Sequence, residues 1–148
     1  MTLLIQRATG IHLDSIYGLD PQARSDAARR DFIQRSVSFG NCYIGTKDDE
    51  SLVAYGVLEY SFFNHGFIPL IYIGLDHRRQ GNGLALMKYL ESYCRTAKLF
   101  TSANHSNIPM QMLLRKLTYK LSGVLHDLDE NDPELIFCKA IRVVNIMG

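Results

Sequence analysis

The feature that most constrains the fold is a strand–loop–helix pattern in residues 67–97. An apolar segment with Ile71, Tyr72 and Ile73 at its centre runs directly into the basic, glycine-containing loop 78–83, whose sequence is RRQGNG. Beyond this loop, apolar residues recur at steps of three and four, as on one face of a helix: Leu86, Met87, Leu90, Tyr93, Cys94 and Ala97. The pattern predicts a strand that enters a glycine turn and opens a helix.

A turn of this kind is suited to holding an anion. The first N–H groups of a helix have no partner within the helix, and the helix dipole places partial positive charge there. Arg78 and Arg79 add full charges that suit phosphate. Two common phosphate loops are excluded, because Lys-Ser or Lys-Thr does not follow Gly83 and because Leu86 stands where a dinucleotide fingerprint needs glycine or alanine. An ordinary turn without a ligand is the alternative interpretation of the loop taken alone.

Two motifs carry a resemblance to a known family. The spacing Arg78-x-x-Gly81-x-Gly83 at the start of a mid-chain helix resembles the pyrophosphate loop of the GNAT superfamily of N-acetyltransferases, which bind acetyl-coenzyme A (acetyl-CoA). Residues 107–119, NIPMQMLLRKLTY, are similar to the family's Asn-x-x-Ala-x-x-Leu-Tyr-x-Lys-x-Gly-Phe helix. On these motifs the chain is identified as a member of the superfamily, without a subfamily.

The order of predicted elements fits that resemblance from end to end. We expect Asp20 or Ser25 to cap a second helix, whose apolar face includes Ala28, Phe32, Ile33 and Val37 and whose arginines (24, 29, 30 and 35) face solvent. Strands are predicted at 3–8, 41–46, 52–62, 67–75, 99–102, 121–128 and 135–141, and helices over 11–39 with a break near 18–21, after the glycine loop, and from 106 or 107 onward. Antiparallel strands combined with helix-linked strands predict a mixed α/β fold, the GNAT fold, with a central mixed sheet of about seven strands and about four helices. The 148 residues are expected to form a single domain, 1–148.

Composition excludes several classes of function. A net charge of +1 gives no electrostatic reason to expect nucleic acid or a membrane surface as partner, and no apolar run approaches the roughly 20 residues that a membrane span needs. The N-terminal segment lacks the basic region of a secretory signal, and three cysteines without CxxC spacing indicate free thiols. We therefore expect a cytoplasmic protein without a metal.

The acidic turn 126–134 leaves two interpretations open. Asp127, Asp129 and Asn131 imitate the first ligands of a calcium loop, but Asp132 stands where glycine is required and Cys138 where the bidentate glutamate should be, so calcium is not expected. The turn is either a solvated hairpin or an acidic overhang that attracts a cationic amine.

The resemblance assigns the coenzyme to particular residues. It implies that main-chain groups of the predicted strand meet the acetyl-pantetheine end, that amides of the loop hold the pyrophosphate, and that a small residue in the first helical turn lets the coenzyme approach. It also implies that the second helix contacts the pantetheine arm through its first motif residue. The positions concerned are Ile71, Tyr72, Ile73, Arg78, Arg79, Gln80, Gly81, Asn82, Gly83, Leu84, Ala85, Asn107 and Leu114.

The usual proton-transfer positions of the family are empty. Phe67 and Ser102 occupy the two places where a glutamate base is found, and Leu114 occupies the place of the tyrosine acid. Glu59 and Tyr60, near the end of a strand expected to border the cleft, are the candidate replacements, and the backbone N–H of Ile73 is the candidate oxyanion donor. Tyr119 and His65 are alternatives, interpreted first as a core residue and a solvated turn residue.

These observations predict an enzyme, an acetyl-CoA-dependent N-acetyltransferase. Its acceptor would be a primary amine of a small cationic metabolite or a peptide, attacked directly in a ternary complex, and a homodimer is possible. The alternative is a catalytically inactive module that binds coenzyme A as a sensor, which the empty positions at Phe67, Ser102 and Leu114 would favour.

Overall fold

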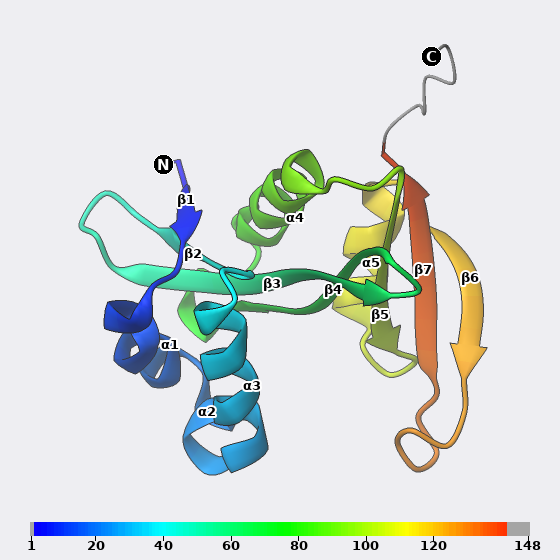
Figure 1. Ribbon diagram of the computed structural model, residues 1–148, viewed down its shortest axis with the longest axis horizontal. Helices are drawn as coiled ribbons and strands as arrows, with labels where there is room; N and C mark the ends of the chain where they lie inside the picture. The colour runs from blue at the N-terminus through cyan, green and yellow to red at the C-terminus, as the bar shows by residue number, and fades with distance from the viewer. Residues whose placement is uncertain (1, 142–148) are drawn as a thin grey trace. The chain divides into compact units, whose positions relative to one another are not determined.

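The computed structural model describes residues 2–141 of the chain (Figure 1). The elements follow in the order β1 (Leu4–Arg7), the short 3-10 helix η1 (Gly10–His12), α1 (Leu13–Leu19), α2 (Pro21–Ser25), α3 (Ala27–Ser38), β2 (Cys42–Thr46), β3 (Leu52–Phe62), β4 (His65–Ile73), η2 (Leu75–His77), α4 (Asn82–Tyr93), β5 (Lys98–Asn104), α5 (Ile108–Lys116), β6 (Lys120–Leu125) and β7 (Glu134–Ala140).

The strands form one hydrogen-bonded sheet in the order β1-β2-β3-β4-β5-β7-β6. β4 and β5 are parallel, while β1 with β2, β2 with β3, β5 with β7 and β6 with β7 are antiparallel. This confirms the predicted mixed sheet of about seven strands, and the described residues form five α-helices rather than about four.

The chain divides into two compact units, each assembled from two separate segments. Unit 1 comprises Met1–Leu58 and Leu70–Leu90, and unit 2 comprises Glu59–Pro69 and Glu91–Gly148. Strands β3 and β4 and helix α4 each contribute residues to both units.

In unit 1 the predicted second helix is broken in two. Asp26 adopts an extended conformation and accepts hydrogen bonds from the N–H groups of Ala28 and Arg29, so that α3 begins one residue later, while Asp20 caps α2 through the N–H of Gln22. The suggestion that Ser25 caps a helix was wrong, because Ser25 is the last residue of α2. Ala28 was also misplaced, since it is exposed, and Ala23, Ile33 and Val37 supply the buried face instead.

The predicted long helix is shorter than its apolar pattern. Leu86, Met87 and Leu90 are buried as expected, but α4 ends at Tyr93, which is exposed, and Ala97 lies beyond the helix. The reason lies in unit 2, where the N–H of Arg95 donates to the hydroxyl of Tyr60 at 3.2 Å and does not continue the helical ladder.

The hairpin between β3 and β4 shifts the start of the next strand. Phe63 and Asn64 both have positive φ, 51° and 62°, which makes a tight two-residue turn and lets β4 begin at His65 rather than at Phe67. At the other end β4 stops at Ile73, because Leu75–His77 forms a 3-10 turn where the sequence pattern predicted strand.

Candidate active site

The glycine loop, residues 78–83, joins β4 to α4 within unit 1. The peptide after Ile73 leaves the strand and is fixed at Gly74, whose N–H donates to the carbonyl of Val53 at 2.8 Å and whose carbonyl accepts from the N–H of His77 at 2.9 Å. The 3-10 turn then delivers the chain to the loop, and α4 begins at Asn82. The predicted strand–loop–helix pattern is therefore present.

The loop has the backbone conformation of an anion-binding turn. Arg79 and Gly81 have positive φ, 61° and 82°, and Gln80 between them does not. Alternation of this kind turns successive N–H groups toward one concavity. The helix's first backbone bond in this loop runs from the N–H of Ala85 to the carbonyl of Gly81 at 3.0 Å, so the amides just before Ala85 sit at the positive end of the helix dipole.

Asn82 holds the loop together from inside. Its side chain is buried, and its amide nitrogen donates to the carbonyl of His77 at 2.8 Å. Any contribution of Asn82 to an anion therefore comes from its backbone, while its side chain ties the loop to the turn that precedes it.

The two arginines of the loop are placed differently. The side chain of Arg78 folds back on β4: its Nε donates to the carbonyl of Ile73 at 2.9 Å, and its guanidinium carbon lies 5.3 Å from the centre of the Tyr72 ring. Arg79 is exposed and has no side-chain partner among the residues that the structure describes. Of the two predicted phosphate cations, only Arg79 has a guanidinium that is not already engaged.

Sequence reasoning missed a buried network beneath β4. The ring of Tyr72 lies 6.0 Å from that of Tyr55, and the Tyr55 hydroxyl donates to the carboxylate of Asp20, which also accepts from Nε of Arg29 at 3.1 Å. Asp20 is 1% exposed and Tyr55 is fully buried. Burial and the bond to Asp20 raise the pKa of Tyr55. Only the Asp-Pro pair at 20–21 hinted at this network, and it indicated a helix cap.

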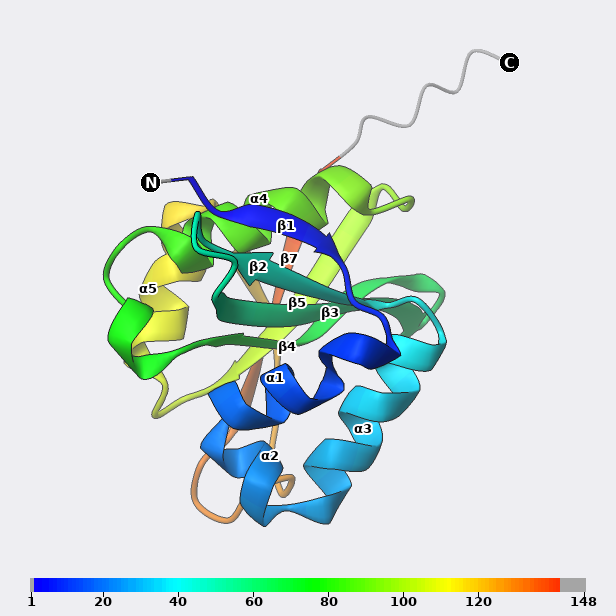
Figure 2. The same cartoon turned by 90° about the vertical axis from the view of Figure 1, so that its left-hand side faces the viewer.

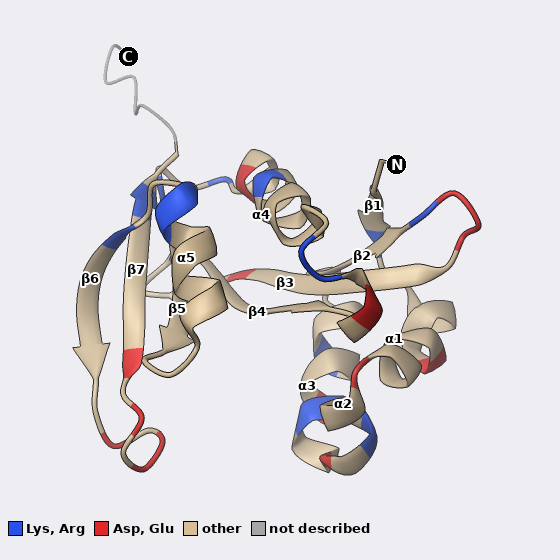
Figure 3. Cartoon of the chain, turned by 180° about the vertical axis from the view of Figure 1, so that it is seen from behind, with Lys and Arg blue, Asp and Glu red and all other residues tan. Residues whose placement is uncertain are grey.

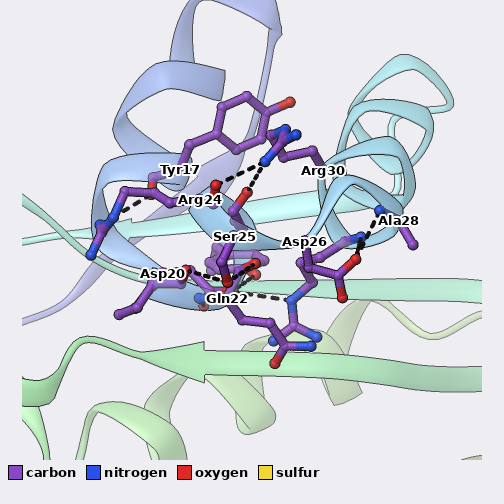
Figure 4. Close-up of polar contacts among 12 residues, drawn as sticks. Tyr17, Asp20, Gln22, Arg24, Ser25, Asp26, Ala28 and Arg30 are labelled. Atoms are coloured by element: carbon purple, nitrogen blue, oxygen red, sulfur yellow. Dashed lines mark hydrogen bonds and ion pairs between the residues drawn. The ribbon is translucent and has the colours of Figure 1, made fainter.

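The arginines expected to face solvent close the short helices instead (Figure 4). Arg24 donates to the carbonyls of Tyr17 and Gly18 at the end of α1, and Arg30 donates to the carbonyls of Ala23 and Arg24 at the end of α2. Since Asp20 and Asp26 satisfy the starts of α2 and α3, both ends of the five-residue helix α2 are capped.

The second motif lies in unit 2, where Asn107 begins α5. Its side-chain oxygen accepts from the N–H of Met110 at 3.2 Å, with Pro109 in the first turn as predicted. Leu114 is fully buried and has no proton to give.

The candidate proton-transfer residues of unit 2 have different surroundings. Glu59 is half-buried and accepts a hydrogen bond from the hydroxyl of Ser61 at 2.6 Å. The Tyr60 hydroxyl accepts from the N–H of Arg95 and donates to the carbonyl of Tyr93 at 3.4 Å, and the Arg95 guanidinium lies 4.1 Å from the Tyr60 ring. Tyr60 is thus placed at the end of α4.

The remaining positions are occupied by packing side chains. The ring of Phe67 stacks on Phe62 at 4.9 Å. Tyr119 is buried, as expected, and donates to Glu91 at 2.9 Å; burial and the Glu91 carboxylate raise its pKa. Nδ1 of His65 is buried and finds no hydrogen-bond partner in the described part of the chain.

The acidic turn is partly tied down. Asp129 accepts from the side-chain amide of Asn104 at 2.8 Å, and Asp132 accepts from the N–H and hydroxyl of Ser106. The Ser106 hydroxyl bond lowers the pKa of Asp132. Residues 2–141 contain no group of three or more histidine, cysteine or acidic side chains arranged to hold a metal ion. No helix within this range has the length and apolar content to cross a membrane.

Comparison with known proteins places this geometry in a family. The acetyltransferase (GNAT) family model matches residues 10–119, whereas comparison with curated proteins gives no match. Among solved structures, the chain is similar to a GNAT-family acetyltransferase from Bacillus cereus ATCC 10987, with 32% identity and a TM-score of 0.87 over 95% of this chain and 98% of the other.

Two more distant structures share the fold. Nourseothricin acetyltransferase is 22% identical, with a TM-score of 0.63 over 68% of this chain and 65% of that one. The ribosomal-protein-S18-alanine N-acetyltransferase from Escherichia coli is 15% identical, with a TM-score of 0.78 over 99% of both chains. With the family model spanning both motifs and the Bacillus cereus structure matching nearly end to end, the chain belongs to the GNAT acetyltransferase family, whose general reaction is acetyl transfer from acetyl-CoA.

Proposed function

We propose that this protein transfers the acetyl group of acetyl-CoA to a primary amine of a small cationic metabolite or a peptide, by direct attack in a ternary complex. The observation that carries the proposal is the glycine loop, whose alternating φ angles and position at the start of α4 suit a pyrophosphate. We further propose that residues 1–148 act as one acetyltransferase domain, since the family match draws on segments of both units.

Each part of the site has a task in the proposed reaction. Amides of residues 79–84, with the guanidinium of Arg79, bind the pyrophosphate, and the backbone of Ile71, Tyr72 and Ile73 meets the acetyl-pantetheine end. The amine nitrogen forms the new bond to the thioester carbon, the Ile73 N–H stabilises the oxyanion, and the C–S bond then breaks to release coenzyme A. Glu59 takes the amine proton, directly or through a water, and the departing thiolate is protonated from solvent.

The family allows both kinds of acceptor. One structural neighbour is named for acetylation of a protein alanine and another for acetylation of nourseothricin, so the shared fold does not select between a peptide and a small molecule. The unpaired carboxylates of the acidic turn, Asp127 and Glu130, favour a cationic acceptor.

A coenzyme-A sensor without transferase activity is the second candidate. It is favoured by Phe67 and Leu114, which pack as apolar side chains at positions where the family places proton-transfer groups. The two candidates share the coenzyme site and differ only in turnover.

The test begins with calorimetric titration of acetyl-CoA into the full chain, followed by release of coenzyme A across a panel of primary amines. Binding with amine-dependent release is the result we expect. Binding without turnover on any amine would leave the sensor, and absence of binding would overturn both candidates.

A substitution in the loop checks the site itself. Gly83→Arg places a long side chain at the first turn of α4, where the pyrophosphate is proposed to sit, and should abolish binding while the protein stays folded. Gly10→Arg is the matched control, because Gly10 lies in η1 with open space around its Cβ position and should bind normally. Retained affinity in Gly83→Arg would remove the loop assignment.

A further inference from the structure

Strand β6 is an unusually apolar edge of unit 2. It lies last in the sheet order, with β7 as its neighbour, and five of its six residues are exposed. Three of these are apolar: Leu121 is 56%, Val124 46% and Leu125 48% exposed, and Leu128 in the following turn is 61% exposed. Edge strands are normally protected by proline or charge; β6 has no proline, its one charged residue is Lys120 at its first position, and it has only a register irregularity between Leu121 and Gly123.

The charges around β6 are separated along its length (Figure 3). Lys120 begins the strand, while the turn that follows it contains Asp127, Asp129, Glu130 and Asp132. Asp129 and Asp132 are already engaged by Asn104 and Ser106. Lys120, Asp127 and Glu130 have no side-chain partner among the described residues. One end of the edge therefore carries a free positive charge and the other end carries free negative charges.

This arrangement is complementary to itself. When two copies of one strand pair antiparallel about a two-fold axis, the start of each strand faces the end of the other. Lys120 of each copy then faces Asp127 and Glu130 of the other copy, twice in the interface, and Leu121, Val124 and Leu125 meet across the axis. Parallel pairing would bring like charges together at both ends, so the charges select the antiparallel arrangement.

We propose that β6 is the contact strand of a homodimer, in which two copies of this chain pair their β6 edges antiparallel about a two-fold axis. The main chain of β6 donates and accepts the hydrogen bonds that its free edge leaves open, and the apolar side chains leave water. An interface built on one six-residue strand and its following turn is small, so we expect a dissociation constant in the micromolar range.

The first experiment measures the oligomeric state of the full chain. Sedimentation equilibrium over a series from low to several hundred micromolar should show a monomer–dimer equilibrium at physiological salt. Val124→Lys should weaken the dimer at least about tenfold, because a charge opposite its own copy at the axis is repelled. Leu4→Lys, an exposed leucine on the other edge strand β1, is the matched control and should leave the dimer unchanged.

The second experiment exchanges the charges. Lys120→Glu alone, and Asp127→Lys with Glu130→Lys in a second protein, should each weaken self-association, since each creates like charges at both ends. Mixing the two proteins should restore a dimer, because Glu at position 120 of one copy then faces two lysines of the other and the remaining pair is native. Far-UV circular dichroism confirms that these exposed substitutions leave the fold intact.

Three results would overturn the proposal. The first is a wild-type chain that stays monomeric throughout the series. The second is a dimer that Val124→Lys leaves intact, and the third is a mixture of the charge variants that stays monomeric. Truncation after Ile141 tests the other occupant of the edge: a monomer that dimerises only when residues 142–148 are removed would show that they take the place of the second copy.

Discussion

Asp20 shows how one side chain organises several elements of unit 1. Its carboxylate caps α2 through Gln22, accepts from Arg29 of α3 and accepts from the hydroxyl of Tyr55 on β3. Because it is 1% exposed, every one of these donors replaces a water that it has lost.

Removing this carboxylate should be costly. Asp20→Ala strands the Tyr55 hydroxyl and the Arg29 guanidinium, and we expect the free energy of unfolding to fall by about 3–5 kcal/mol. Urea denaturation followed by circular dichroism measures it. The control is Asp26→Ala, the same change at a half-buried cap with two backbone donors, which should cost about 1 kcal/mol. Equal losses would mean that the buried network adds nothing to the cap.

Cys42 makes stability depend on alkaline pH. Burial raises the pKa of its thiol from 9.0 to about 12, so between these values the unfolded chain binds fewer protons than the folded one. The stabilisation is complete below pH 9 and is lost as pH rises toward 12, with a slope of at most about 1.4 kcal/mol per pH unit.

Unfolding free energies measured between pH 8.5 and pH 10, flagged here as about the window in which the thiol titrates and tyrosines do not, should therefore decline in the wild type. Cys42→Val should flatten that decline, whatever its effect on absolute stability. An equal slope in both proteins would assign the pH dependence to another group.

At the scale of elements, the junction of β4 and α4 combines two functions in adjacent arginines. Arg78 binds the carbonyl of Ile73 and stacks on Tyr72, whereas Arg79 is free to meet an anion. On the proposed function, Arg78 is a positioning residue for the end of the strand that meets the thioester.

The two arginines should consequently fail in different ways. Arg78→Met loses a hydrogen bond and a cation–π contact, together worth about 1–2 kcal/mol, and should lower kcat about tenfold with little change in the Kd for acetyl-CoA. Arg79→Met should instead raise that Kd about fivefold, because it loses a charge at the pyrophosphate. Steady-state kinetics and calorimetry separate the two effects, and a shared rise in Kd would show that Arg78 also binds phosphate.

The elements that the sequence predicted correctly depend on local chemistry. Asn107 caps α5 because an asparagine oxygen reaches the N–H three residues on, and the pattern of 52–62 forms β3 with those same limits. The errors came from contacts distant in sequence. Nothing near Cys94 indicates that α4 must stop there, since the residue responsible is Tyr60, 35 positions before Arg95.

The same distinction applies to the candidate site. The loop's conformation follows from glycine and the helix start, so it was predictable. The direction taken by Arg78 was not, because a guanidinium can bind a phosphate or a carbonyl equally well and the choice depends on where Ile73 and Tyr72 lie. Asp20 and Tyr55 meet across 35 residues, which no local pattern records.

At the scale of the whole molecule, the two units share their elements. A division between Leu58 and Glu59 cuts β3, and the other boundaries cut β4 and α4. Neither unit has a complete set of strands and helices of its own, so we expect neither to fold alone.

The chain should therefore unfold in a single cooperative transition. Calorimetric and van't Hoff enthalpies should agree, and hydrogen exchange should show the slowest amides of both units exchanging with one global free energy. Two resolved transitions, or slow amides confined to one unit, would contradict this expectation.

The burial of all three cysteines has a practical consequence for enzymology. Cys42 lies in β2, Cys94 follows α4 and Cys138 lies in β7, and each is buried as a free thiol. Disulfide reagents react with exposed thiolates, so the native protein should be silent toward Ellman's reagent while free coenzyme A is not. The colour that develops in such an assay then counts product alone, and a slow background signal would report how often one of the two units opens.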